Sequence, residues 1–67
     1  MSPRKLSRVI KTLRESKGLS QKALADAVGV TDAYITMLET GKRKNPSLDI
    51  LKKLAKALGV PVTELLG

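Results

Sequence analysis

Four glycines divide the chain into short segments, and their spacing constrains the possible folds more than any other feature of the sequence. Each stands just past a run that contains apolar residues: Gly18, Gly29, Gly41 and Gly59. A glycine directly beyond a helix adopts a positive φ at little cost, so this placement is typical of helix C-termini. The segments that follow open with residue types that favour helix N-caps, among them Ser20, Thr31 and Ser47. The spacing therefore predicts short helices joined by tight turns.

The apolar residues of each segment recur at the spacing of one helical face. The first helix, which we expect Ser2 to cap and Pro3 to begin, carries Leu6, Val9, Ile10 and Leu13. The next two helices direct inward Leu24, Ala25 and Val28, and then Ile35 and Leu38. The fourth carries Leu48, Leu51, Leu54, Ala55 and Leu58, and Pro61 precedes a short last helix that returns Leu65 to the core, with Leu66 as a second candidate. No segment alternates apolar and polar residues, so the pattern predicts an all-α fold without strands.

The chain of 67 residues contains neither cysteine nor histidine. Disulfides and the commonest ligands of structural zinc are therefore excluded, and packing alone must hold the fold. We expect one domain over residues 1–67 with no metal, cofactor or small-molecule ligand. The groups left for catalysis are scattered carboxylates, lysines and one tyrosine, with no pairing that would place two of them at a shared site. We therefore expect no enzymatic activity.

The net charge is strongly positive, with 13 Lys and Arg against 6 Asp and Glu, or +7 at pH 7. Such a balance is typical of proteins whose partner is a polyanion. Tyr34 is the single aromatic residue, which argues against insertion into a membrane surface and against stacking on single-stranded nucleic acid. The N-terminus has no apolar stretch that would serve as a signal peptide, so we expect a cytoplasmic protein. Double-stranded DNA is the partner that these observations favour.

Residues 21–39 have the spacing of two short helices that cross steeply. Ala25 is small where the second of them approaches the first, and Gly29 supplies the left-handed backbone of the turn between them. Ile35 and Leu38 anchor the following helix from below and leave its outer side free to meet a groove. This arrangement predicts a short exposed helix that is held by its neighbours.

A series of residues in register resembles the lambda-repressor-like helix-turn-helix family, which includes phage repressors, Cro and XRE-type regulators. The matching residues are Gly18-Leu19-Ser20-Gln21, Leu24-Ala25, Gly29-Val30, Leu38-Glu39, Gly41, Asn45-Pro46-Ser47-Leu48 and Leu54-Ala55-Lys56-Ala57-Leu58-Gly59-Val60. The resemblance covers nearly the whole chain. It implies a compact five-helix domain, with the helix-turn-helix at the second and third helices, that binds operator DNA as a symmetric homodimer.

The resemblance also implies roles for individual residues. A recognition helix at residues 32–40 lies in the major groove, and the base-facing positions are Thr31, Asp32, Ala33, Thr36 and Met37. The positions that contact phosphate are Gln21, Tyr34, Lys42, Arg43, Lys44 and Asn45, and Gln21 also braces a recognition-helix residue. Arg14 and Glu39 form a partly buried ion pair with a structural role.

Several of these roles keep an alternative. Ala33 and Met37 depart from the family's polar residues and offer only apolar contact, best suited to a thymine methyl. Asp32 either accepts from cytosine N4 or is merely a first-turn carboxylate, and Thr36 reaches either a base or a phosphate. Tyr34 either gives its hydroxyl to a phosphate or packs in the core. In the first helix, Arg4, Arg8 and Lys11 are candidates for contact with flanking phosphates. We expect Lys52, Lys53 and Lys56 of the fourth helix to face solvent.

The function predicted from these observations is sequence-specific binding of double-stranded DNA by a transcriptional regulator, most simply a repressor. The alternative is a protein-interaction module, such as an antitoxin-like partner, that uses the same fold. A homodimer interface is expected around Val60, Val62 and Leu66. A steep loss of binding affinity with increasing salt concentration favours DNA binding over a protein-interaction module.

Overall fold

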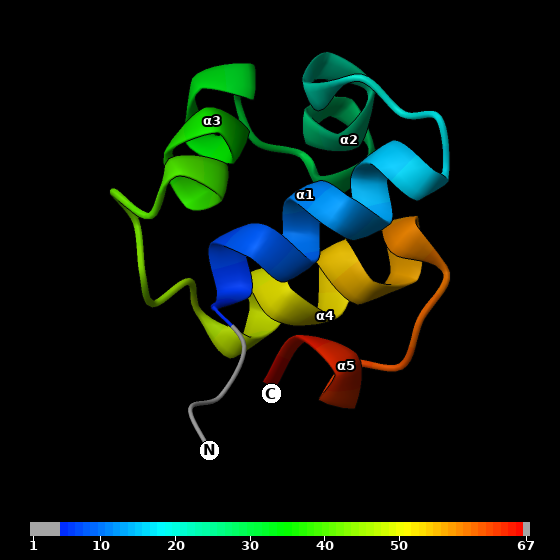
Figure 1. The fold of residues 1–67 in the computed structure, drawn as a ribbon, viewed down its shortest axis with the longest axis vertical. Helices are drawn as coiled ribbons and strands as arrows, with labels where there is room; N and C mark the ends of the chain where they lie inside the picture. Colours follow the sequence, from blue (N-terminus) through cyan, green and yellow to red (C-terminus); the bar gives the residue numbers. More distant parts are fainter. Residues whose placement is uncertain (1–4, 67) are drawn as a thin grey trace.

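The computed structural model describes residues 5–66, and this part of the chain folds into five α-helices with no strand (Figure 1). The helices are α1 (Leu6–Ser16), α2 (Gln21–Val28), α3 (Asp32–Thr40), α4 (Leu48–Leu58) and α5 (Thr63–Leu66). The predicted all-α, five-helix architecture is confirmed. Lys5 is extended at the start of α1 and provides no side-chain cap, while the predicted cap Ser2 and its neighbours Pro3 and Arg4 lie outside the described residues.

The helix boundaries follow from local hydrogen bonds that the sequence predicts. At the start of α2, α3 and α4 a hydroxyl oxygen accepts from the backbone N–H of the residue three positions on, and the capping residues are Ser20, Thr31 and Ser47. Gly29 ends α2 with φ of 86°, and its N–H donates to the carbonyl of Ala25 over 2.8 Å. This left-handed residue turns the chain sharply into α3, because no side chain at that position would tolerate the backbone conformation without strain.

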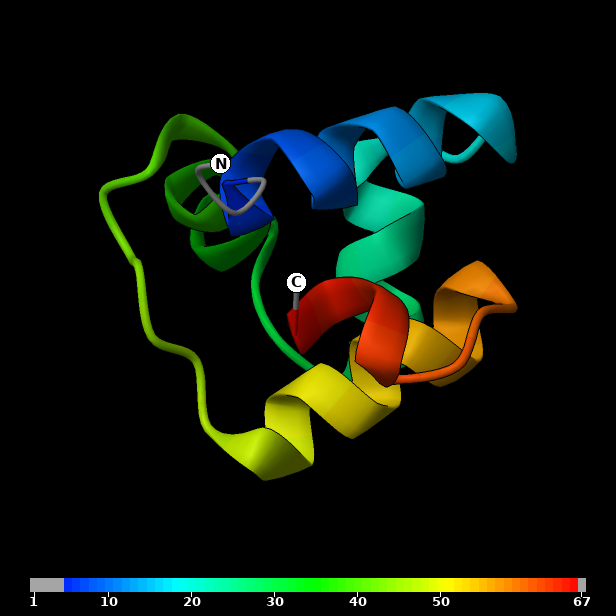
Figure 2. The ribbon, with the colours of Figure 1, turned by 60° about the horizontal axis from the view of Figure 1, so that its bottom comes forward.

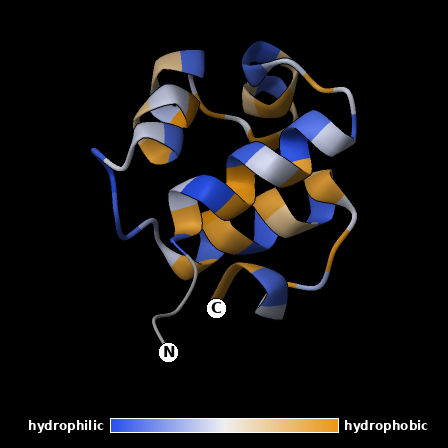
Figure 3. Ribbon diagram, viewed as in Figure 1, coloured by the Kyte–Doolittle hydropathy of each residue, from blue (hydrophilic) through white to orange (hydrophobic). Residues whose placement is uncertain are grey.

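The helices pack around one apolar core. α3 contacts α1 and α2, α2 also contacts α4, and α5 lies between α1 and α4 (Figure 2). Figure 3 shows apolar residues along both α1 and α4, and the buried ones belong to this core. The fully buried large side chains come from four helices and are Ile10, Leu24, Ile35, Leu38, Leu54 and Leu58. The core predicted from the helical spacing is therefore confirmed for these residues, with Leu6 and Leu13 at its partly buried margin.

Two apolar residues lie differently from the prediction. The helical spacing predicts Leu48 in the apolar stripe of α4, but the residue is 54% exposed. It is the first residue of α4, and this first turn projects past the other helices (Figure 2), so correct spacing alone does not bury it. Leu66, the second candidate of the last helix, is 57% exposed. Adjacent helical residues point about 100° apart, so Leu65, which is buried in the core, turns Leu66 outward.

Within residues 5–66, no helix combines the length and the apolar character needed to cross a membrane.

Candidate nucleic-acid interface

α3 is buried on one side and open on the other. Ile35 and Leu38 are buried in the core, which holds α3 against α1 and α2. Its outer side consists of three exposed residues, Asp32, Ala33 and Thr36, together with the half-buried Met37. The structure thus brings together four of the five residues predicted to face bases, and it leaves them accessible.

Thr31, the fifth of these residues, is exposed and acts as the N-cap of α3. Its hydroxyl oxygen accepts from the backbone N–H of Tyr34 over 3.1 Å. A hydroxyl group can accept one bond and still donate another, so the cap leaves the hydrogen of Thr31 available. The position immediately before α3 therefore has a structural role beside any role in binding.

The ion pair expected between Arg14 of α1 and Glu39 of α3 is present. The guanidinium donates from Nε to Oε2 over 2.6 Å and from Nη2 to Oε1 over 3.1 Å, a bidentate arrangement. Nη1 donates to the carbonyl of Leu19 over 2.7 Å. Both side chains are well shielded, 11% exposed for Arg14 and 3% for Glu39. The pair fixes the C-terminal half of α3 to α1 and to the chain that leads into α2.

The electrostatics of this pair keep Arg14 charged. The hydrogen bond with Glu39 raises the pKa of Arg14 above its ordinary value, while burial acts in the opposite direction. A raised pKa means that the stabilising charge is present below the normal arginine value and is lost only above it. Arg14 therefore contributes no change of stability with pH across the neutral range.

Gln21 extends the ion pair to the outer side of α3. Its Nε2 donates to Glu39 Oε1 over 3.0 Å, and its Oε1 accepts from the hydroxyl of Thr36 over 2.9 Å. We call Arg14, Gln21, Thr36 and Glu39 the polar network. The bracing of the recognition helix that the resemblance implied for Gln21 is thus found in the structure, with Thr36 as the braced residue. One hydrogen of Nε2 has no bond to protein atoms of residues 5–66.

The residues that follow α3, 41–47, form a basic loop that stays close to this helix. The backbone N–H of Arg43 donates to the carbonyl of Met37 over 3.1 Å, and the guanidinium lies 5.5 Å from the centre of the Tyr34 ring. Such a distance permits a cation–π contact. Tyr34 also packs partly against the core, so its ring serves as a support for Arg43. The exposed members of the loop include Lys42, Lys44 and Asn45.

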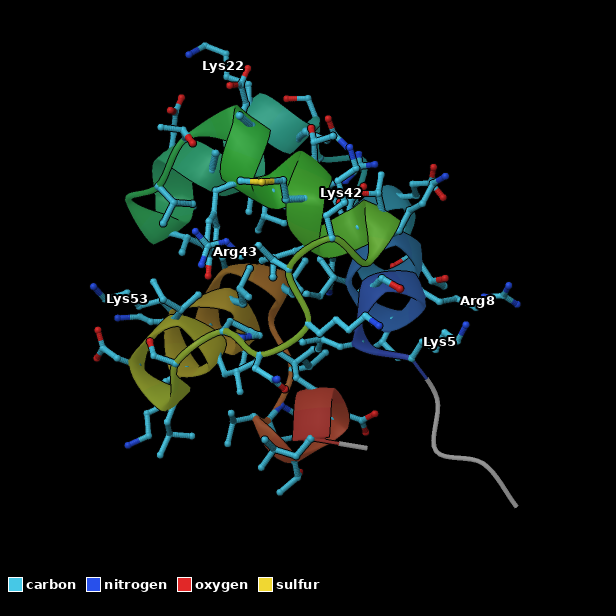
Figure 4. All side chains as sticks on the ribbon, turned by 90° about the vertical axis from the view of Figure 1, so that its left-hand side faces the viewer. Lys5, Arg8, Lys22, Lys42, Arg43 and Lys53 are labelled. Carbon is cyan, nitrogen blue, oxygen red and sulfur yellow. The ribbon has the colours of Figure 1, made fainter. Side chains whose placement is uncertain are left out.

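A basic recess lies beside this loop and includes residues that sequence reasoning missed. Its volume is about 490 Å³, and its lining is Lys5, Leu6, Ser7, Thr40, Gly41, Arg43 and Lys44. Figure 4 shows Lys5 on the same side of the molecule as Lys42 and Arg43. Lys5 is brought there because α1 packs against α3, a long-range contact that local sequence patterns do not reveal. Thr40 had a local signal, since it follows Thr36 by one helical turn.

The remaining cations are dispersed. Arg8 lines a separate recess of about 190 Å³ that also includes Glu64 of α5, which places it apart from the basic loop. Lys52, Lys53 and Lys56 are exposed on α4 as expected, and Lys53 pairs with Asp49 over 3.4 Å at the surface. Across residues 5–66 there is no group of acidic side chains arranged to hold a metal ion.

Comparison with known proteins identifies the type of domain. The family model described as helix-turn-helix matches residues 10–65. The HTH-type transcriptional regulator SlrR of Bacillus subtilis is 40% identical over 60 residues, which cover 90% of this chain and 40% of that protein. The chain spans 40% to 52% of the length of SlrR and three other similar regulators.

Solved structures agree with the family match. A crystal structure of SinR, described as the master regulator for biofilm formation and bound to DNA, superposes with a TM-score of 0.88 and 35% identity, covering 92% of this chain and 98% of that chain. The DNA-binding domain of the P22 c2 repressor superposes with a TM-score of 0.92 and 29% identity, covering 98% of this chain and 86% of that chain. The predicted lambda-repressor-like resemblance is therefore confirmed. These neighbours are DNA-binding domains of regulators, not enzymes, in line with the expectation that the chain has no catalytic activity.

Proposed function

Because the chain belongs to the helix-turn-helix family, we propose that it binds double-stranded DNA with α3 in the major groove and thereby regulates transcription. One observation carries this proposal: the outer side of α3 is exposed, while its opposite side is anchored in the core and a basic loop adjoins its C-terminal end. An α-helix fits the width of the major groove, and flanking cations favour the adjacent phosphates. The SinR–DNA structure supports binding to DNA, since the two domains share their fold.

The contacts divide between phosphates and bases. We assign phosphate contacts to Lys42, Arg43, Lys44, Asn45 and the hydroxyl of Tyr34. Gln21 joins them through the hydrogen of Nε2 that the polar network leaves over. Lys5 is added because it lines the basic recess with Arg43 and Lys44. Base contacts fall to Thr31 and the outer side of α3, where Ala33 and Met37 suit a thymine methyl.

We propose that the protein acts as a homodimer on DNA. Val60 and Val62 are half-buried and Leu66 is 57% exposed, so apolar atoms are accessible at the end of the chain where α5 lies. Two copies related by a twofold axis would read half-sites about 34 Å apart, one turn of the double helix. Sedimentation of the protein with a two-half-site duplex, compared with a one-half-site duplex, tests this: a single bound copy on both would contradict it.

Repression is the regulatory sense that we propose, as in the P22 c2 repressor, whose DNA-binding domain has the same fold. A repressor acts where the chromosome is, so we propose that this protein acts in the cytoplasm. We propose that residues 1–67 belong to one DNA-binding domain.

Selection of binding sites from a random duplex pool tests the proposal. We expect an enriched, two-fold symmetric motif whose affinity falls steeply with salt, by about 0.9 in log affinity per log salt for each neutralised phosphate. A flat salt dependence, or no enriched motif together with tight binding to an acidic protein, would favour the protein-interaction alternative.

A further inference from the structure

The ion pair fixes the orientation of the Gln21 side chain. Glu39 is a carboxylate bonded to the Arg14 guanidinium, and an ionised carboxylate can only accept hydrogen bonds. The group of Gln21 that lies 3.0 Å from Glu39 Oε1 must therefore be the donor Nε2. The carbonyl oxygen, Oε1, is then directed to Thr36. The buried charge thus determines which end of the amide reaches Thr36.

Thr36 consequently has no hydrogen left for an external partner. Its hydroxyl carries one hydrogen, and two acceptors lie within reach: Gln21 Oε1 at 2.9 Å and the carbonyl of Asp32 at 3.1 Å. Neither of these oxygens can donate, so the hydrogen is directed to one or the other. Thr36 is exposed, and it presents a lone pair of Oγ1 to solvent.

The neighbours of Thr36 along the same line of α3 have the same character. Asp32, one turn earlier, is exposed and carries a carboxylate. Thr40, one turn later, donates its hydroxyl hydrogen to the carbonyl of Thr36 over 2.9 Å. This acceptor stripe, Asp32, Thr36 and Thr40, contrasts with the donors of the basic loop beside it.

We infer that Thr36 is a specificity residue that accepts a hydrogen bond from an amino group in the major groove, and that it contacts no phosphate. This inference rests on the proposed DNA binding and deepens it. Adenine N6 and cytosine N4 carry the amino groups of the major groove, whereas guanine O6, thymine O4 and phosphate oxygens only accept. Thr36 therefore selects adenine or cytosine over guanine or thymine at the base that it faces.

Three forms of the full chain test the inference: wild type, Thr36→Val and Thr36→Ser. Valine keeps the shape but removes the acceptor, and serine keeps the hydroxyl. Site selection with wild type and Thr36→Val locates the facing base as the position whose preference the valine form relaxes. Thermal unfolding checks that the exposed substitutions leave the fold intact.

The amino group is then deleted from that base alone, with purine in place of adenine or 2-pyrimidinone in place of cytosine. We expect binding by wild type and Thr36→Ser to weaken about threefold to tenfold, the size of one hydrogen bond, and binding by Thr36→Val to stay unchanged. A facing base that is guanine or thymine would overturn the inference, as would an equal loss in all three forms or no position relaxed by valine.

A phosphate contact is tested in the same series. Replacement of each nearby phosphate by an uncharged methylphosphonate should weaken DNA binding by wild type and by Thr36→Val to the same extent. A position that weakens wild type but not Thr36→Val would show that Thr36 donates to phosphate, which contradicts the inference and leaves the proposed function standing. Failure of wild type to bind any duplex in a salt-dependent manner would instead overturn the proposed function, and the inference with it.

Discussion

Two charged regions adjoin α3. The charges of the polar network are paired inside the protein, whereas the charges of the basic loop lie at the surface. In the polar network the Arg14 guanidinium uses three nitrogens inside the protein, two of them on Glu39. In the basic loop Lys42, Arg43 and Lys44 have no ion pair with residues 5–66, and the Arg43 guanidinium lies over the face of Tyr34. Charges of the first kind position the helix, and charges of the second kind remain available to a partner.

The two regions show why the number of cations alone describes this surface poorly. Arg14 is one of the 13 Lys and Arg residues of the chain, yet its charge is paired with Glu39 in a shielded site. Surface pairs such as Lys22–Asp26, 3.8 Å apart, are exposed and contribute little to stability. Removal of a charge should therefore cost stability in the polar network and affinity in the basic loop.

The largest effect is expected from Glu39→Ala. This change leaves Arg14 without its partner in a shielded site, and we expect the free energy of unfolding to fall by about 3–5 kcal/mol. Urea denaturation measures the change, with Asp26→Ala, which removes an exposed carboxylate from α2, as the control. Equal urea midpoints for the two variants would show that the ion pair has no structural role.

The next effect concerns the basic loop. Replacement of Lys42, Arg43 and Lys44 by alanine should weaken binding to all duplexes alike and reduce the salt slope by up to about 2.7, or about 0.9 per phosphate contact. The control removes the same charge from α4 by replacing Lys52, Lys53 and Lys56. If both triple variants change the slope equally, the loop acts only through net charge and the comparison between the two regions fails.

A smaller loss of stability is expected from Gly29→Ala. A Cβ at this position meets no atom within 4 Å, so the cost arises from the backbone alone, at φ of 86°. We expect the free energy of unfolding to decrease by about 1–2 kcal/mol. Thermal or urea unfolding measures it, and an unchanged stability would mean that the turn relaxes without strain.

The smallest effect is expected from Met37→Ala. Met37 is half-buried at the edge of the outer side of α3, and its loss should alter preference at a single base pair with little change in stability. Site selection with the variant measures this. Loss of preference across several base pairs would instead indicate that Met37 positions the whole helix.

Local chemistry made most of the fold predictable. The caps Ser20, Thr31 and Ser47 act within a few residues of their partners, and the core of α2 and α3 follows helical spacing. The error at Leu48 arose because exposure at a helix end depends on what packs beyond it. Helical spacing identifies the residues that share one face of a helix. It does not say how much of that face the neighbouring helices cover.

The residues of the site were more predictable from the sequence than the side-chain contacts between them. The family resemblance placed Gln21 and the Arg14–Glu39 pair, but the choice of Thr36 as the bonded residue depends on a contact between positions 15 residues apart. Lys5 joined the basic recess through the packing of α1 on α3, which no local pattern encodes. Long-range side-chain contacts therefore account for what the sequence left open.

Backbone amide chemical shifts, followed while a selected duplex is added to the labelled protein, test whether α3 and the basic loop form the DNA-binding surface. We expect the largest changes on residues 31–37 and 41–45, with little change on the exposed side of α4 at Lys52 and Lys56. Changes concentrated on α4 and α5, with the outer side of α3 unaffected, would contradict it.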